Sequence, residues 1–190
     1  TKADPSSARK NEGLPAFWMR SIFTGYVSAW QMENERLRRK KQITFSLKNG
    51  MLQFLLVQLA LIIAIAVFFS IKILAFYMVA AVFGFLLLET VNYIEHYGLQ
   101  RQKVSAFRYE NTSPKHSWNS NHVVGRLMLF ELSRHSDHHY KASKKYQVLK
   151  HHLESPQMPT GYPGMIILAL FPPLWFRVMN ARLEGDLNRK

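Results

Sequence analysis

Two uninterrupted apolar stretches dominate the pattern of hydrophobic and polar positions along the chain. Residues 51–69 contain no charged side chain, and residues 73–88 are uncharged as well. A helix that crosses the hydrocarbon core of a bilayer needs about 20 predominantly apolar residues. The helical pattern continues beyond the second stretch to His96, and only Ser70-Ile71-Lys72 separates the two stretches. We therefore predict two antiparallel transmembrane helices joined by a tight turn.

Segments that contain both apolar and polar residues lie before and after these two stretches. In residues 14–35, aromatic and aliphatic side chains recur every three or four positions, which predicts an amphipathic helix at a membrane surface or against a protein core. Residues 165–176 are apolar, but they are short and contain Pro172-Pro173, which favours a re-entrant or interfacial segment. The expected divisions are a cytoplasmic amphipathic and basic segment (1–42), two transmembrane helices (43–95), a cytoplasmic histidine-bearing region (96–160), the re-entrant or interfacial segment (161–178) and a polar tail (179–190).

The charge is strongly positive, with 25 Lys and Arg against 12 Asp and Glu. Nucleic acid is the first partner that such a balance suggests. However, the basic run 36–41 directly precedes the first apolar stretch, and Arg101, Lys103 and Arg108 follow the second. Basic residues beside membrane spans mark the cytoplasmic side. We therefore expect a lipid bilayer as partner and no nucleic acid, with both outer ends in the cytoplasm and Lys72 on the far side.

Histidines carry the candidate chemistry, because the chain contains no Cys for thiolate ligands or an iron–sulfur cluster. His135, His138 and His139 have i, i+3 and i+4 spacing, so a helix would project all three from one face. Imidazole binds zinc, copper, iron and nickel. Asp137 lies between them and could orient a ring N–H. The alternative is a solvated surface turn.

A second candidate, His96, lies at the end of the second apolar stretch, next to Glu95. Ionisable groups near the end of a membrane helix are functional candidates. Four histidines suit a structural zinc site, but a cysteine-free cluster at the ends of membrane helices fits redox iron better. The other histidines divide into His116 and His122, which could be ligands, partners of ligands or surface groups, and His151-His152, which we expect at the surface.

Several segments carry a resemblance to one family. Asn92-Tyr93-Ile94-Glu95-His96-Tyr97-Gly98-Leu99 resembles the HYG box of the integral-membrane alkane 1-monooxygenases, and Arg134-His135-Ser136-Asp137-His138-His139 resembles their last histidine box. The segments 116–121, 156–165 and 170–179 are also similar to parts of that family. The likeness follows the order of the family over essentially the whole chain, whereas the last box alone is typical of the wider superfamily of membrane desaturases and hydroxylases.

The resemblance implies an all-α integral membrane fold, in which this chain forms part of a transmembrane helical bundle with a cytoplasmic di-iron region. It implies that two non-haem irons hydroxylate the terminal carbon of a linear alkane with O2. It also implies that electrons come from rubredoxin and its reductase, and we expect the protein in the bacterial inner membrane. His96, His135, His138 and His139 match the iron ligands. Asp137 and, more weakly, Glu95 match groups that orient those ligands, whereas His116 and His122 are not ligands in the family pattern.

The chain also departs from the family. Ser133 replaces a usual Gln and Tyr140 a usual Ala, and two upstream histidine boxes of the family are absent. We therefore expect a C-terminal fragment that is inactive alone. The alternatives are a related desaturase or hydroxylase of fatty-acyl or terpenoid chains and a non-catalytic, membrane-anchored metal-binding protein. A basic strip that follows the last box could dock acidic rubredoxin or contact anionic lipid; it comprises Lys141, Lys144, Lys145 and Lys150.

Overall fold

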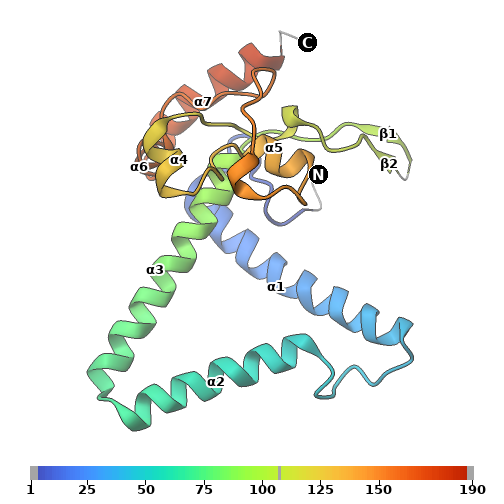
Figure 1. The fold of residues 1–190 in the computed structure, drawn as a ribbon, viewed down its shortest axis with the longest axis vertical. Coiled ribbons are helices and arrows are strands. Elements are labelled where there is room, and N and C mark those ends of the chain that lie inside the picture. The colour runs from blue at the N-terminus through green and yellow to red at the C-terminus, as the bar shows by residue number, and fades with distance from the viewer. Residues whose placement is uncertain (1–3, 107, 188–190) are drawn as a thin grey trace. The chain divides into compact units, whose positions relative to one another are not determined.

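A computed structural model describes residues 4–106 and 108–187 of the chain (Figure 1). This part divides into two compact units, of which one is Arg20–Leu87 and the other contains the residues before and after it. The helices are α1 (Leu14–Arg39), α2 (Gly50–Phe68), α3 (Ile71–His96), α4 (Val123–Met128), α5 (His135–Tyr140), α6 (Tyr162–Ala169) and α7 (Pro172–Leu187). The strands β1 (Lys103–Ser105) and β2 (Arg108–Tyr109) pair antiparallel, and short 3-10 turns cover Pro114–His116 and Tyr146–Val148.

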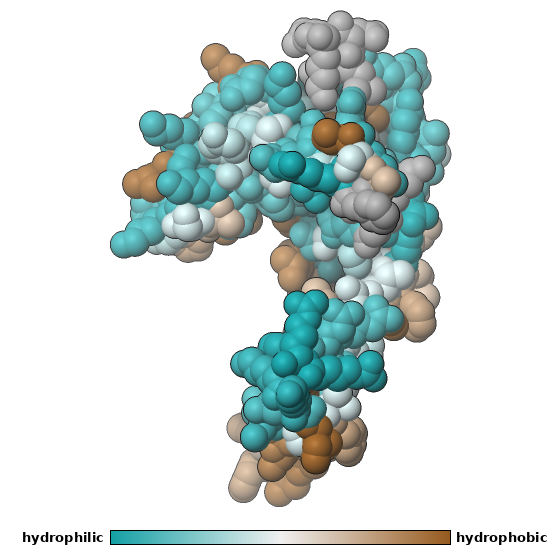
Figure 2. Space-filling view, turned by 90° about the vertical axis from the view of Figure 1, so that its right-hand side faces the viewer, coloured by the Kyte–Doolittle hydropathy of each residue, from teal (hydrophilic) through white to brown (hydrophobic). Residues whose placement is uncertain are grey.

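The two apolar stretches form the predicted helices. Both α2 and α3 are long and apolar enough to cross a membrane, and neither buries any of its most apolar window. Helices that are hydrophobic on all sides and exposed in isolation are typical of membrane spans. Figure 2 shows brown, hydrophobic surface at the lower end of the view, where Figure 1 draws α2. The protein is therefore an all-α integral membrane protein.

The connection between α1 and α2 is built from specific caps. Helix α1 ends in a Schellman motif, because Gln42 N–H donates to the carbonyl of Leu37 while Lys41 adopts the left-handed conformation with φ of 53°. Asn49 then caps α2, since its side-chain oxygen accepts from the N–H groups of Met51 and Leu52. Helix α1 therefore ends within the basic run, and residues 40–49 connect it to α2.

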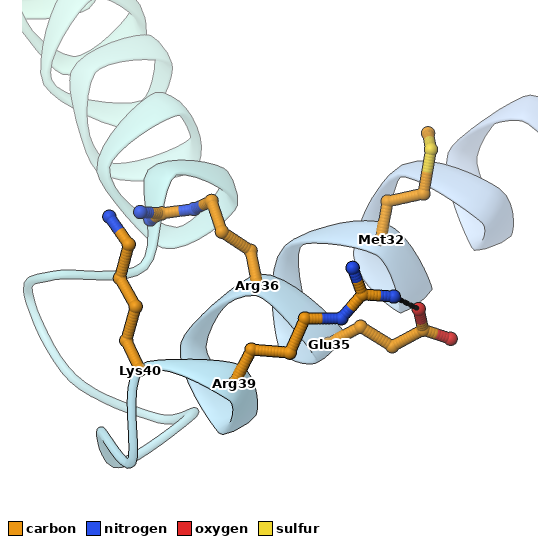
Figure 3. Close-up of a pocket in the computed structure, with 5 residues that line it drawn as sticks. All are labelled: Met32, Glu35, Arg36, Arg39 and Lys40. Atoms are coloured by element: carbon orange, nitrogen blue, oxygen red, sulfur yellow. Dashed lines mark ion pairs between the residues drawn. The ribbon is translucent and has the colours of Figure 1, made fainter.

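Glu33 joins these two helices within the unit Arg20–Leu87. Its Oε1 accepts from the Gly50 N–H at 2.6 Å and pairs with the Arg36 guanidinium at 2.6 Å. The Arg36 side chain also donates to the Lys48 carbonyl at 3.2 Å. An open pocket of about 390 Å³ includes Arg36 in its lining, which is Met32, Glu35, Arg36, Arg39 and Lys40. Figure 3 draws these side chains and the ion pair between Arg39 and Glu35.

An aromatic core organises the other unit. Tyr93 at the end of α3 packs against Phe17 of α1 and Trp175 of α7, with ring centroids 5.4 and 5.0 Å apart. Tyr97 packs on Trp175 at 5.2 Å. Fully buried aromatic rings contribute large apolar areas and favour tilted or edge-to-face contacts of this kind. The core therefore fixes the end of α3, where His96 lies, against the C-terminal helix.

Several boundaries differ from the sequence expectation. Pro172-Pro173 begins α7 instead of only interrupting the apolar segment, because proline is favoured in the first helical turn. The helix then continues to Leu187 through most of the expected polar tail. Helix α4 ends at Met128, and Phe130 and Glu131 just after it both adopt positive φ. The assignment of the five segments to sides of the membrane stays a prediction.

Candidate metal centre

His96 is the last residue of α3, and a tight turn that depends on Gly98 follows it. Helix α3 ends at His96, and Gly98 then adopts φ of 72° while its N–H donates to the Ala8 carbonyl at 3.0 Å. A Cβ atom at position 98 would lie 2.6 Å from Cδ2 of Leu183 in α7. Glycine is therefore favoured twice at this position, because its backbone conformation is left-handed and because a Cβ atom would displace the Leu183 side chain.

Helix α5 carries the last histidine box and is only six residues long. A helix of this length is not stable by itself, so tertiary contacts must hold it. Ser136 is buried and donates to Oδ1 of Asn119 at 3.0 Å. Arg134, which precedes the helix, donates to the Leu149 carbonyl at 2.7 Å. These contacts fix the direction in which the histidines of α5 project.

Three imidazoles meet at the junction of α3 and α5. One ring nitrogen from each of His96, His135 and His139 lies within 4.8 Å of the others, and the Nε2 atoms of His96 and His135 are 3.2 Å apart. His135 is buried, His96 is half-buried and His139 is exposed. His138 lies outside this group, with its ring centroid 6.1 Å from that of His135. Its assignment as a ligand stays a prediction.

Glu95 orients the buried member of this group. Its Oε1 lies 3.2 Å from Nδ1 of His135 and also accepts the Tyr162 hydroxyl at 2.6 Å. With Nδ1 of His135 turned to Glu95, its Nε2 atom faces His96. Burial, together with the neighbouring imidazoles of His96, His139 and His138, lowers the pKa of His135 well below its usual value. His135 is therefore neutral, which is the form that binds metals.

Asp137 bonds to residues that follow α5, and its expected role as a partner of a metal ligand stays a prediction. The carboxylate is fully buried and accepts from Nζ of Lys144 at 2.6 Å, from the Lys150 N–H at 2.8 Å and from Nε2 of His152 at 2.8 Å. Burial would raise the pKa of Asp137, but the hydrogen bonds from Lys144, His152 and Lys150 outweigh it and hold the pKa at about 2. Asp137 thus connects the segment 141–152 to α5 through hydrogen bonds.

The expectation that His151 and His152 lie at the surface was also wrong. Both are half-buried, and His151 pairs with Nδ2 of Asn119 at 2.7 Å, while His152 joins the Asp137 network. Asn119 is completely buried and also bonds through its backbone to Pro156 and Met158. Sequence spacing could not reveal these pairs, because the partners are distant in the chain. The only sequence signal was that Asn119 lies in a segment resembling the family.

The remaining histidines and the two unusual residues have separate positions. His116 bonds to Glu110 at 3.0 Å and to Ser113, and His122 is exposed at the start of α4. Ser133 is buried, with Gly125 of α4 beside it. Tyr140 is exposed and its ring lies 6.2 Å from that of His152. Neither substitution removes a nitrogen atom from the histidine group.

The donor set fits a transition metal of intermediate softness. Neutral imidazole nitrogens converge, and the buried His135 is oriented by a carboxylate, as is common for metal-binding histidines. The absence of Cys excludes thiolate ligation, and imidazole is a good ligand for iron. The site is therefore a histidine-rich centre at the end of a membrane helix.

Comparison with known proteins places this site in a family. The family model for fatty acid desaturases matches residues 1–169, and the chain belongs to this family. More specifically, it is 43% identical over 185 residues to alkane 1-monooxygenase 2 of Pseudomonas aeruginosa and 42% identical over 194 residues to the alkane 1-monooxygenase of Ectopseudomonas oleovorans. These matches cover 97% and 100% of this chain, but 49% and 48% of the relatives.

A more distant relative is the hydroxylase component XylM of the xylene/toluene monooxygenase of Pseudomonas putida. It is 26% identical over 179 residues, covering 94% of this chain and 47% of that protein. The chain thus spans about half the length of the curated relatives that it matches. The family assignment agrees with the resemblance seen in the histidine boxes, and it agrees with the two apolar helices as membrane spans.

Proposed function

We propose that this protein hydroxylates the terminal carbon of linear alkanes, using O2 and two electrons at a centre of two non-haem irons. The observation that supports this most directly is the convergence of His96, His135 and His139 at the end of an apolar helix. Similarity to alkane 1-monooxygenases over nearly the whole chain supports the reaction class. Iron, when bound, would supply the activation of O2 that no amino-acid side chain provides.

The residues of this chain have distinct roles in the proposal. His96, His135 and His139 present imidazole nitrogens, and His138 of α5 joins them as a fourth ligand. Glu95 keeps a proton on Nδ1 of His135 through the contact of 3.2 Å and so fixes which nitrogen faces the metal. The apolar surfaces of α2 and α3 suit a hydrocarbon substrate that partitions into the bilayer.

Four imidazoles are too few for two irons. Di-iron centres in helical proteins use about six protein side chains. We therefore infer that further ligands come from residues outside these 190, as the histidine boxes of the family imply. The coverage of only about half of each relative supports this inference. The 190 residues alone are then expected to hold less than the full complement of iron and to be inactive.

The membrane orientation follows from the charges. Basic residues precede α2 and follow α3, so we infer that the histidine centre faces the cytoplasm of a bacterial inner membrane. Electrons would come from a rubredoxin and its reductase. The basic strip is one docking surface for an acidic donor, although Lys144 is engaged by Asp137, which leaves Lys141, Lys145 and Lys150 exposed. Anionic lipid is the competing partner of these lysines.

The test is turnover by the full-length protein in membranes, with rubredoxin, its reductase, NADH and linear alkanes of several lengths. We expect 1-alkanols as products, and rates that fall with salt if the strip docks the donor. His135→Ala and His138→Ala should abolish turnover and lower bound iron. His122→Ala is the matched control, since His122 is exposed and outside the group, and it should retain turnover.

Competing substrates decide between related reactions. The similarity to the xylene/toluene monooxygenase component XylM makes hydroxylation of xylene or toluene a second candidate, and the match to the fatty acid desaturase family makes fatty-acyl chains a third substrate class. Both substrates should therefore be supplied in the same assay. Product from either of them without any 1-alkanol would overturn the alkane proposal, and so would alkane turnover that survives His135→Ala.

A further inference from the structure

Helix α6 reaches the histidine centre through a single hydroxyl group. Tyr162 is the first residue of α6, and its hydroxyl donates to Oε1 of Glu95 at 2.6 Å. The same oxygen lies 3.2 Å from Nδ1 of His135. The Tyr162 hydrogen bond and the contact between Glu95 and His135 thus connect α6 to a residue of the metal-binding group.

Each member of this chain is buried. Tyr162 is 2% exposed, Glu95 is 5% exposed and His135 is 9% exposed. A buried carboxylate needs hydrogen-bond donors, because it has lost its hydration. In the described structure Tyr162 donates a hydrogen bond to the Glu95 side chain, and Nδ1 of His135 lies 3.2 Å from the same oxygen. The hydroxyl therefore fixes the rotation of the carboxylate, and this rotation determines where the oxygen that faces His135 lies.

The backbone of Glu95 and the ring of Tyr162 are also held in place by their neighbours. The carbonyl of Glu95 accepts from the Trp118 N–H at 2.8 Å. A Cβ atom at Gly125 would lie 3.6 Å from the ring of Tyr162, so α4 closes on one side of the ring. Burial, with the Glu95 carboxylate as a further cause, raises the pKa of Tyr162 well above its usual value, so the phenol keeps the proton that it donates.

We propose that Tyr162 is a positioning residue for the metal centre, which acts through Glu95 to set the orientation of the His135 imidazole. The proposal rests on the function proposed above in one respect, that His135 binds iron. It gives the apolar segment 161–178 a role at the metal centre that its hydrophobic character does not suggest.

The first experiment compares Tyr162→Phe with the unaltered full-length protein. Iron per protein is measured after equilibration with a graded series of chelator concentrations, and the iron centre is examined by Mössbauer spectroscopy. Loss of a hydrogen bond to a ligand-orienting group typically weakens metal binding by 10–100-fold. We expect about a 10-fold weaker retention of iron and a changed Mössbauer signature at one iron, because His135 would no longer be held in one orientation.

Tyr93→Phe is the matched control. Tyr93 belongs to the same buried cluster, and its hydroxyl donates a comparable bond of 2.7 Å, but to the Glu12 backbone carbonyl. Removal of this bond should lower thermal stability about as much as Tyr162→Phe, and should leave iron retention and the Mössbauer signature unchanged. Equal effects of the two variants on iron would reduce Tyr162 to a core residue and overturn the proposal.

A double-mutant cycle with Glu95→Gln tests the route of the effect. If Tyr162 acts through Glu95, Tyr162→Phe should weaken iron retention much less in the Glu95→Gln background than in the unaltered protein. Additive effects would contradict this route. Alkane turnover is scored separately. If the iron retention of the variants shows the expected coupling but the iron-loaded unaltered protein oxidises no alkane, only the proposed reaction is overturned. If the unaltered protein binds no iron, both proposals are overturned.

Discussion

Asp137 illustrates how one buried carboxylate can organise residues that are far from it in sequence. Its oxygens accept bonds from Lys144, Lys150 and His152, which are 7, 13 and 15 positions away. Charge-assisted hydrogen bonds of this kind are stronger than neutral ones. The segment after α5 contains only a short 3-10 turn, so this network provides much of what holds it in place.

Asp137→Ala should therefore loosen the segment 141–152. We expect the free energy of local opening to fall by about 2 kcal/mol. This is less than the full cost of leaving a buried charge without a partner, because Lys144 keeps access to solvent. The decrease corresponds to a roughly 30-fold larger open population. Trypsin cleavage after Lys144, Lys145 and Lys150 should accelerate accordingly, and limited proteolysis followed by mass spectrometry measures this.

Glu154→Ala is the control for this substitution. Glu154 also pairs with His152, at 3.0 Å, but its side chain is 52% exposed. Exposed ion pairs contribute little to stability. The cleavage rates should then stay near those of the unaltered protein. Equal acceleration in both variants would show that His152, and not the Asp137 carboxylate, holds the segment.

The histidines could be predicted at this scale, but their partners could not. His135 and His139 share one helical face by spacing alone, so a local pattern was sufficient. Glu95 was recognised only by its position next to His96. The bond from Tyr162 to Glu95 joins residues 67 positions apart, and no periodicity encodes such a contact. The bonds of Asp137 to Lys150 and His152 likewise span 13 and 15 positions, and no local pattern indicates them.

At the scale of elements, the α1–α2 junction is sensitive to acid. Hydrogen bonds from Arg36 and from the Gly50 N–H lower the pKa of Glu33 from 4.5 to about 2. A carboxyl group with a lowered pKa stabilises the fold above its unfolded pKa and ceases to do so as the pH falls through the folded value. Protection of amides 40–53 from hydrogen exchange should thus persist at pH 5 and decline between pH 4.5 and 2.

Glu33→Gln should reduce this protection already at neutral pH and remove its decline in acid, because the charge that binds Arg36 is gone. Glu35→Gln serves as the comparison. Glu35 pairs with Arg39 at 3.6 Å, and both side chains are largely exposed. The comparison variant should retain the acid dependence of the unaltered protein. An unchanged decline in Glu33→Gln would assign the acid sensitivity to another group.

Elements were predictable where composition alone decides them. The two spans follow from uninterrupted apolar residues, and the structure places α2 and α3 close to the expected positions. The ends of α4 and α7 were not predictable. The positive φ of Phe130 and Glu131 ends α4 without any Gly or Pro signal, and α7 continues past its apolar residues because Met179 and Leu183 pack into the aromatic core.

At the scale of the whole molecule, the proposed orientation can be tested with introduced cysteines, because the chain has none of its own. Lys72 is the second residue of α3, beside the turn that joins the two spans, and Ser143 lies after the last histidine box; each is replaced by Cys. A membrane-impermeant maleimide applied to intact cells should label position 72 through the periplasm. Position 143 should react only after the inner membrane is permeabilised.

The unaltered protein is the blank in this experiment, and both variants should retain alkane turnover, since neither residue belongs to the proposed centre. Labelling of position 143 in intact cells would reverse the orientation. It would also place the histidine centre on the side opposite to the cytoplasmic electron donors that the proposal requires.

The close approach of Leu183 to Gly98 has a consequence for the mutational paths open to this protein. Substitution of Gly98 by Ala meets two obstacles, the methyl contact of 2.6 Å and the φ of 72°. Shortening Leu183 removes only the first. Asn tolerates the left-handed conformation better than other residues with a Cβ. Replacement of Gly98 is therefore expected only after Leu183 in α7, 85 positions downstream, has been exchanged for a smaller residue. Even then Asn is a better replacement than Ala.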